Sequence, residues 1–183
     1  MRYIALLRGI NVGGNTMIKM EELRRTFEAL QFENVVSYIN SGNLAFDVSS
    51  PHVGKDSSPN EAKLIAKIES AVQNDFGKSI PVMIRDQPDI ARILKNNPFD
   101  GKFESHKEMH VLFMKDEMPK VKQNQLLDQQ TDNERFAVKG REIYCNLKLG
   151  VADSLLGKGF IDKKLKTPIT GRNWQTVQKL AEL

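Results

Sequence analysis

A glycine-rich stretch near the N-terminus combines residue types that can bind an anion. The stretch "RGINVGGNT", residues 8–16, follows a short apolar run at residues 3–7. Backbone N–H groups exposed by glycines, with a guanidinium beside them, form a concave set of donors that suits a phosphate or a carboxylate. From Gly9 the chain reads G-x-x-x-x-G-N-T, without the lysine of the phosphate-binding pattern G-x-x-x-x-G-K-[ST]. An anion-binding loop and a plain surface turn both fit this stretch.

Two further polar segments could join this loop in one site. Ser41, Gly42 and Asn43 separate two β-rich runs, and Arg172 and Asn173 precede the last helical segment. A guanidinium next to a helix N-terminus also suits an anion. We therefore expect a ligand-binding cleft between two modules. The expected ligand-binding residues are Arg8, Asn11, Gly13, Gly14, Asn15, Ser41, Gly42, Asn43, Arg172 and Asn173.

The same polar residues also allow a purely structural interpretation. Asn43 and Asn173 are of a residue type that often caps turns and helices. Trp174 would then pack in the core, and Arg172 would hold the last helix through a salt bridge. The sequence does not decide between the two interpretations.

The elements that must position the first loop follow the order βαββαβ. The expected strands span residues 3–7, 35–40, 44–48 and 80–85, and the expected helices span residues 20–31 and 64–76. The Ser- and Pro-rich residues 49–60 indicate a surface loop. This order predicts a ferredoxin-like antiparallel sheet with its helices on one face, over residues 1–86. In such a sheet residues 8–15 lie beside the turn at residues 41–43, and Gly77 and Lys78 reach the same rim.

Residues 87–183 indicate a second, related module. The expected helices span residues 89–95, 120–130, 152–156 and 174–183, and the expected strands span residues 110–115, 135–138 and 142–147. From residue 110 these elements form a βαββα unit followed by a C-terminal helix. The sequence therefore predicts an α+β protein of two small modules.

Composition and charge narrow the class of protein. The chain has 183 residues, of which 40% are hydrophobic and 27% charged, and this balance is ordinary for a globular protein. Its net charge is +4, and the Lys and Arg residues are spread along the chain. This charge is compatible with a polyanionic partner but does not indicate one. The N-terminal apolar run is too short for a signal peptide or a membrane span. We therefore expect a bacterial cytoplasmic protein that does not contact membranes.

The sequence offers no recognisable catalytic or metal-binding arrangement. Cys145 is the only cysteine and lies in a strand-like segment, so we expect it to be a buried hydrophobic residue. His106 and His110 are four residues apart, but no carboxylate pattern accompanies them, and we expect no metal site. Catalytic residues and cofactors stay unknown, and the sequence does not decide whether the protein is an enzyme.

Five segments spread along the chain carry a family resemblance. They read "ALLRGINVGG", "MEELRRTFEAL", "YINSGNLAF", "NPF" and "RNWQTVQKL". With these motifs the chain resembles the bacterial domain-of-unknown-function family 1697, which implies a two-module α+β protein without an established activity. The chain departs from the family pattern at Asn15, where relatives often have lysine, at Gln31, where glycine is usual, and at Gly171, where threonine is usual.

The leading expectation is a protein that binds a small anionic ligand, such as a nucleotide or a phosphorylated metabolite, at the rim of residues 8–15. One alternative is a nucleic-acid-binding module, because ferredoxin-like sheets bind single-stranded RNA when aromatic rings on central strands stack on bases. Tyr3 and Phe46 would supply such rings, although "SGNLAFDV" departs from the aromatic-rich RNA-binding pattern. Another alternative is a partner-binding protein without a small ligand. The oligomeric state is not indicated.

Overall fold

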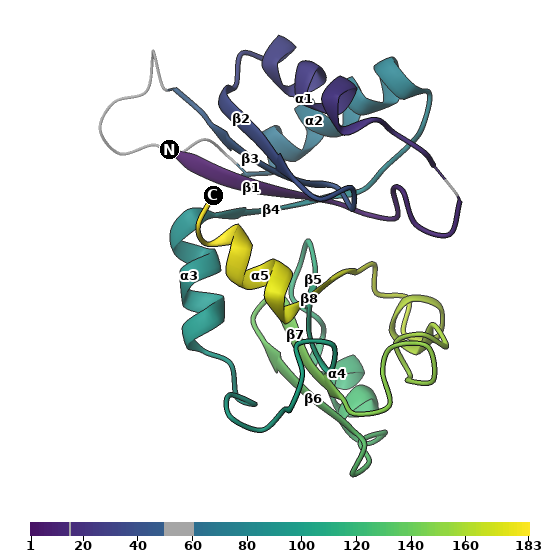
Figure 1. The fold of residues 1–183 in the computed structure, drawn as a ribbon. Helices are drawn as coiled ribbons and strands as arrows, with labels where there is room; N and C mark the ends of the chain where they lie inside the picture. Colours follow the sequence, from purple (N-terminus) through teal and green to yellow (C-terminus); the bar gives the residue numbers. More distant parts are fainter. Residues whose placement is uncertain (15, 50–60) are drawn as a thin grey trace. The chain divides into compact units, whose positions relative to one another are not determined.

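The chain forms two compact units, each built around one antiparallel sheet. The computed structural model describes residues 1–14, 16–49 and 61–183. One unit comprises Met1–Ile90 with Leu183, and the other comprises Ala91–Glu182 (Figure 1). Each unit contains a four-stranded sheet with helices, so the predicted α+β class is confirmed.

The first unit places two helices on one face of its sheet. Its elements are β1 (Arg2–Leu7), α1 (Met20–Ala29), β2 (Glu33–Tyr38), β3 (Asn43–Asp47), α2 (Glu61–Phe76) and β4 (Val82–Asp86). The strands lie in the order β2-β3-β1-β4, with every neighbouring pair antiparallel, and α1 and α2 lie on the same side (Figure 1). The strands and helices expected in this part of the chain are all present, with ends shifted by a few residues. The loop predicted at residues 49–60 lies outside the described residues except for Ser49.

Apolar periodicity explains why these elements pack as they do. Leu23 and Phe27 on α1 and Ile68 on α2 are fully buried against Leu7 and Phe46 of the sheet. α2 ends where expected, because Gly77 has a left-handed φ of 65° and its N–H donates to the carbonyl of Gln73. Gln31 has a φ of 66° just after α1, which is a conformation that glycine adopts more easily.

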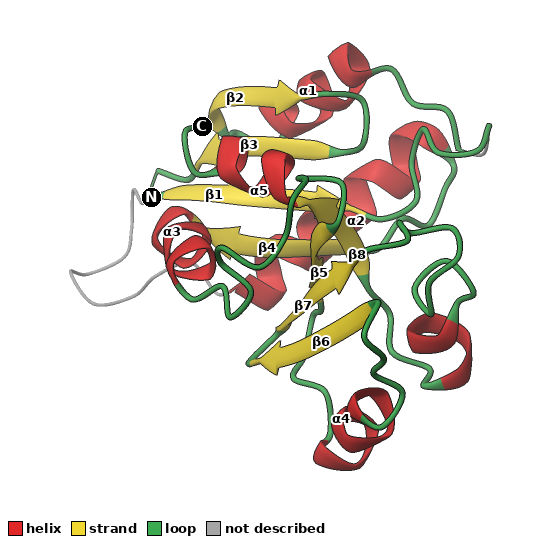
Figure 2. Cartoon of the chain, turned by 60° about the horizontal axis from the view of Figure 1, so that its bottom comes forward, coloured by secondary structure: helices red, strands yellow, loops and turns green. Residues whose placement is uncertain are grey.

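The second unit repeats the strand order with a different set of connections. Its elements are α3 (Gln87–Lys95), which spans the division between the units, β5 (Met109–Phe113), α4 (Lys120–Leu127), β6 (Glu134–Lys139), β7 (Glu142–Leu147), the π-helix η1 (Phe160–Lys164), β8 (Thr170–Asn173) and α5 (Trp174–Leu180). The strands lie in the order β6-β7-β5-β8 and are antiparallel (Figure 2).

No helix among the described residues is long and apolar enough to cross a membrane.

The predicted βαββα order of the second unit is wrong in two places. No helix forms at residues 152–156, where Ser154 Oγ instead donates to the Val151 carbonyl at 2.7 Å and accepts from the Gly157 N–H at 3.3 Å. Gly150 and Gly159 have left-handed φ values of 81° and 74°, so this segment turns repeatedly. The strand β8 was not predicted, because four residues are too few to show a clear period.

Candidate functional site

The structure brings the glycine-rich loop and the hairpin turn of the first unit together. The N–H of Leu7 donates to the carbonyl of Gly42 at 2.8 Å, and the N–H of Arg8 donates to the carbonyl of Pro81 at 3.0 Å. The end of β1, the β2–β3 turn and the connection before β4 therefore meet at one rim. We call it the glycine rim and define it by the described residues 8–14, 16 and 41–43. Arg8 of the glycine rim is half-buried. Lys78 is exposed and lies in the connection that contains Pro81.

Asn11 holds the loop of the glycine rim in place. Its Oδ1 accepts from the N–H of Ile18 at 2.8 Å, and its Nδ2 donates to the carbonyls of Ile18 at 2.9 Å and Asn40 at 2.7 Å. The backbone adds a bond from the N–H of Asn11 to the carbonyl of Thr16 at 3.1 Å. Asn11 therefore fastens the loop both to its own end and to the β2–β3 turn.

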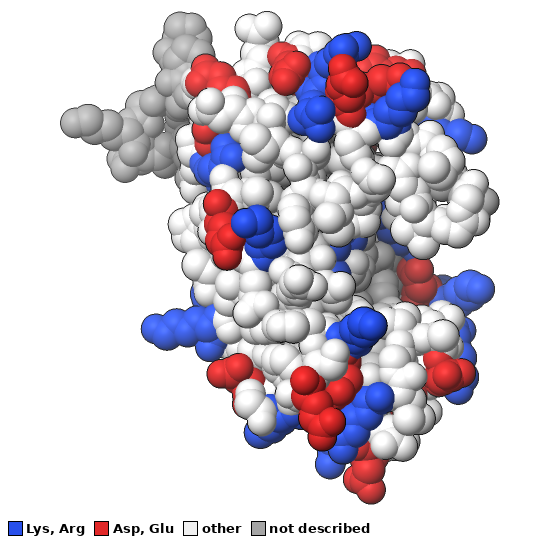
Figure 3. All heavy atoms as spheres, in the orientation of Figure 1, with Lys and Arg blue, Asp and Glu red and all other residues white. Residues whose placement is uncertain are grey.

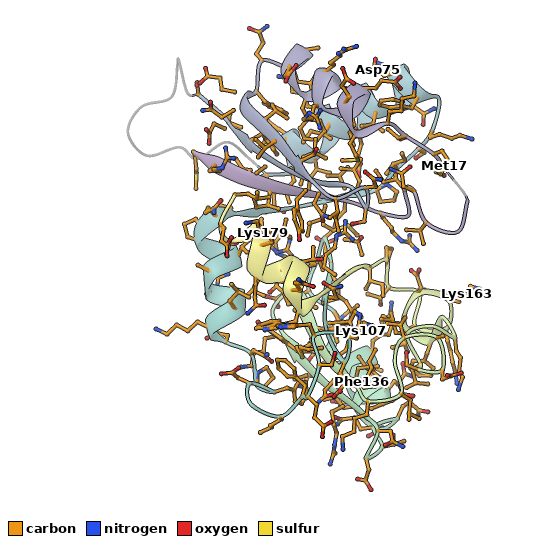
Figure 4. The ribbon with its side chains drawn as sticks, in the orientation of Figure 1. Met17, Asp75, Lys107, Phe136, Lys163 and Lys179 are labelled. Atoms are coloured by element: carbon orange, nitrogen blue, oxygen red, sulfur yellow. The ribbon has the colours of Figure 1, made fainter. Side chains whose placement is uncertain are left out.

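The tip of the loop is exposed. Gly13 and Gly14 have left-handed φ values of 62° and 76°, and a Cβ at either position would meet no heavy atom within 4 Å. Asn15 lies outside the described residues. Val12 and Met17 expose 61% and 73% of their surface on the same connection. Figure 4 labels Met17 in this connection. The tip therefore offers both open glycine backbone and apolar side chains.

The turn beside the loop is tightly packed. Asn43 is fully buried, and its Nδ2 donates to the carbonyl of Tyr38 and to Ser41 Oγ, both at 3.0 Å. Gly42 has a φ of 78°, and a Cβ there would lie 2.9 Å from the Cβ of Leu7. Asn43 and Gly42 therefore shape the turn, as the structural interpretation of the sequence expected.

Arg172 and Asn173 belong to the second unit. Arg172 is 7% exposed, its Nη1 donates to Thr170 Oγ1 and to the Gly171 carbonyl, both at 2.8 Å, and burial lowers the pKa of its guanidinium to about 10. Asn173 caps α5, because its Oδ1 accepts from the N–H of Thr176 at 2.8 Å. Trp174 is 6% exposed and packs in the core, as the structural interpretation also expected.

The aromatic rings considered for RNA binding are buried. Tyr3 and Phe46 are 4% and 0% exposed, and their ring centroids lie 5.9 Å apart in a stack. Phe27 of α1 packs edge-on against Phe46 at 5.4 Å. These rings belong to the core and do not present faces to bases. Figure 3 further shows Lys and Arg interspersed with Asp and Glu on the drawn face, without a continuous basic stripe.

Reactive side chains are few in the described part of the chain. Among these residues no group of three or more His, Cys, Asp and Glu side chains could hold a metal ion. Cys145 is fully buried in β7, and burial raises the pKa of its thiol well above the usual range, so it behaves as the expected hydrophobic residue. His110 lies in β5, and burial lowers the pKa of its imidazole.

Sequence reasoning missed a pocket in the second unit. The pocket has a volume of about 480 Å³ and is hereafter called the basic pocket; its lining residues are Phe99, Lys102, Gln130, Asp132, Arg135, Asn146 and Lys148. They come from the turn after α3, from the α4–β6 connection with the start of β6, and from the end of β7 with the residue that follows it. No local pattern links these three segments, because only the antiparallel pairing of β6 with β7 brings two of them together.

Comparisons with known proteins identify a family and a similar structure. A search of curated proteins found no match. The solved structure of the conserved bacterial protein SP0830 from Streptococcus pneumoniae is similar, with a TM-score of 0.69 and 25% sequence identity over 99% of this chain and 97% of that chain. The family model described as "Protein of unknown function (DUF1697)" matches residues 1–144. The chain therefore belongs to the DUF1697 family.

Proposed function

We propose that this protein binds a small anionic ligand, such as a nucleotide or a phosphorylated metabolite, at the glycine rim. The observation that carries the proposal is the open left-handed backbone of Gly13 and Gly14 on a loop that Asn11 fastens at two points. Exposed glycine backbone on the same loop as Arg8 offers the kind of donors that anions prefer. A loop already held in place also loses little conformational entropy when it binds.

We also infer that the first unit is a ferredoxin-like module. The antiparallel order β2-β3-β1-β4, with α1 and α2 on one face, supports this inference. The same proposal includes the two modules predicted from the sequence, residues 1–86 and 87–183. It also includes a location in the bacterial cytoplasm.

Calorimetric titration of the full chain with inorganic phosphate, AMP and ribose 5-phosphate tests the rim. Arg8→Ala should weaken the binding of a phosphorylated ligand by about tenfold or more, because a hydrogen bond to a charged group contributes about 1.5–3 kcal/mol. Gly13→Val should also weaken binding, because valine strains the left-handed backbone at this position and its side chain occupies the open space at the loop tip. Arg25→Ala is the matched control, since Arg25 is an exposed arginine of the same unit that pairs with Glu21. Wild-type affinity in both rim variants would disprove the assignment.

A second candidate function is recognition of a protein partner through the same loop. The exposed side chains of Val12 and Met17, both on this loop, favour this candidate, because exposed apolar side chains contribute to interaction surfaces. It predicts that no phosphorylated compound binds the rim. It also predicts that Met17→Lys abolishes co-purification of a defined partner while the unfolding temperature stays unchanged.

A further inference from the structure

We propose that the basic pocket is a second binding site, independent of the glycine rim, for a small phosphorylated molecule that also carries a hydroxyl or amino group. The pocket lies entirely within the second unit, where every lining residue belongs. Its volume of about 480 Å³ is in the range of small-ligand pockets, about 300–1,000 Å³.

The fold of the second unit holds the lining residues in fixed positions. Arg135 of β6 lies directly opposite Asn146 of β7, so their side chains project from the same face of the sheet. Beyond the strands, the N–H of Lys148 donates to the carbonyl of Asn133 at 3.0 Å. The turn after α3 is closed by a bond from the N–H of Lys102 to the carbonyl of Phe99 at 2.9 Å. The pocket is therefore built on a paired hairpin and a closed turn.

The charge of the pocket suits an anion. Lys102, Arg135 and Lys148 place three cations around it, against the single carboxylate of Asp132. The closest approach between Arg135 and Asp132 is 4.0 Å, and the Asp132 side chain is fully exposed. An ion pair of this length in water contributes little, so the carboxylate does not satisfy the guanidinium. An anionic group of a ligand would be attracted by the excess positive charge.

The side-chain amide of Asn146 indicates that the ligand also carries a hydrogen-bond donor. Asn146 is 4% exposed, and its Nδ2 donates to the carbonyl of Lys102 at 2.9 Å. Because a carbonyl oxygen only accepts hydrogen bonds, this contact fixes which end of the amide is the oxygen. That oxygen, Oδ1, is buried and has no hydrogen-bond partner among the described residues. A buried acceptor without a donor costs free energy. Asn146 lines the pocket, so a ligand O–H or N–H that reaches Oδ1 would recover that free energy.

Together these features distinguish the ligand from a simple ion. Inorganic phosphate can satisfy the cations but leaves no separate hydroxyl or amino group for Asn146 Oδ1. Phe99 adds an apolar wall that a sugar or a base can contact. The pocket therefore fits a sugar phosphate or a nucleoside monophosphate better than a bare anion.

The test uses ¹H–¹⁵N spectra of the full chain titrated with AMP, ribose 5-phosphate and glycerol 3-phosphate. Propyl phosphate is the matched probe, because it has the chain length of glycerol 3-phosphate without its hydroxyl groups. We expect shifts at the Asn146 side-chain amide and at the backbone of Arg135 and Lys148, with glycerol 3-phosphate binding about fivefold more tightly than propyl phosphate. Absence of shifts at these residues with every probe at about 10 mM, where millimolar dissociation constants are detectable, would overturn the proposal.

Variants separate this site from the glycine rim. The double variant Arg135→Ala/Lys148→Ala removes exposed cations, so it should fold normally and weaken binding of AMP at the pocket at least tenfold. Asn146→Leu should remove the preference for glycerol 3-phosphate over propyl phosphate. Lys163→Ala, at an exposed cation of η1 outside the pocket, is the control and should leave binding unchanged (Figure 4). Unchanged pocket affinity in the double variant would overturn the proposal.

The two proposals fail in different ways in these experiments. Arg8→Ala should leave the shifts at Asn146 and Lys148 intact, because Arg8 belongs to the other unit. Shifts confined to residues 8–16 would support the proposed function and overturn this inference. Shifts confined to the basic pocket would support this inference and disprove the assignment of ligand binding to the glycine rim.

Discussion

Asn11 and Ile18 bond to each other twice across the glycine-rich loop. The N–H of Ile18 donates to Asn11 Oδ1 at 2.8 Å, and Asn11 Nδ2 donates back to the carbonyl of Ile18 at 2.9 Å. The amide side chain of Asn11 thus closes this loop with two hydrogen bonds, as a pair of backbone hydrogen bonds closes a hairpin. The third bond, to the carbonyl of Asn40, ties the closed loop to the β2–β3 turn.

Replacing Asn11 should therefore loosen the glycine rim. Asn11→Ala removes three hydrogen bonds, and part-buried groups that lose their partner cost about 1–3 kcal/mol in total. We expect the free energy of unfolding in urea to fall by that amount, with faster amide hydrogen exchange in residues 8–18. Asn40→Ala keeps its backbone carbonyl and should change stability by less than about 0.5 kcal/mol. Equal stability of Asn11→Ala and wild type would contradict this role.

Two glycines of the same rim should respond differently to alanine. Gly42→Ala combines a left-handed φ of 78° with a Cβ 2.9 Å from Leu7 Cβ, so we expect a loss of more than about 2 kcal/mol. Gly13→Ala has a φ of 62° but open space, so we expect only the backbone cost of about 1 kcal/mol. Urea unfolding of both variants measures the difference. A Gly13→Ala variant as unstable as Gly42→Ala would show that contacts unrelated to the Cβ decide the cost.

The cap of α5 should be measurable at Asn173. Asn173→Ala leaves the N–H of Thr176 without its side-chain acceptor, and N-cap losses cost about 0.5–2 kcal/mol. Asn173→Asp retains an acceptor in the same position and should keep most of the stability. Thermal unfolding of the two variants distinguishes capping from a ligand-binding role, because Asn173→Asp would repel an anion while preserving the helix.

Stability should decrease in mildly acidic solution because of His110. Burial lowers the pKa of His110 in the folded chain below its value of about 6.5 in the unfolded chain. Between these two pKa values the unfolded chain binds more protons, so the free energy of unfolding falls as the pH drops below about 6.5. His110→Gln should reduce this fall in urea unfolding compared at pH 7.5 and pH 5. His106→Gln, at an exposed histidine, is the control for the substitution itself.

Local sequence patterns were enough to predict the order of elements in the first unit, the end of α2 at Gly77 and the burial of Cys145. These features depend on residues close together in the chain: apolar residues at helical or strand spacing, and a glycine that accepts a left-handed φ. The cap at Asn173 follows from the same local rules.

The contacts of the polar residues in the candidate sites could not be predicted from the sequence, because they depend on long-range folding. Asn11 bonds to Asn40, 29 residues away, and the basic pocket joins Phe99, Arg135 and Asn146 from three separate segments. The turns that replace the expected helix at residues 152–156 and the strand β8 likewise depend on contacts within the whole unit. A short polar segment has several local conformations of similar free energy, and the partner that selects one of them lies far away in the sequence.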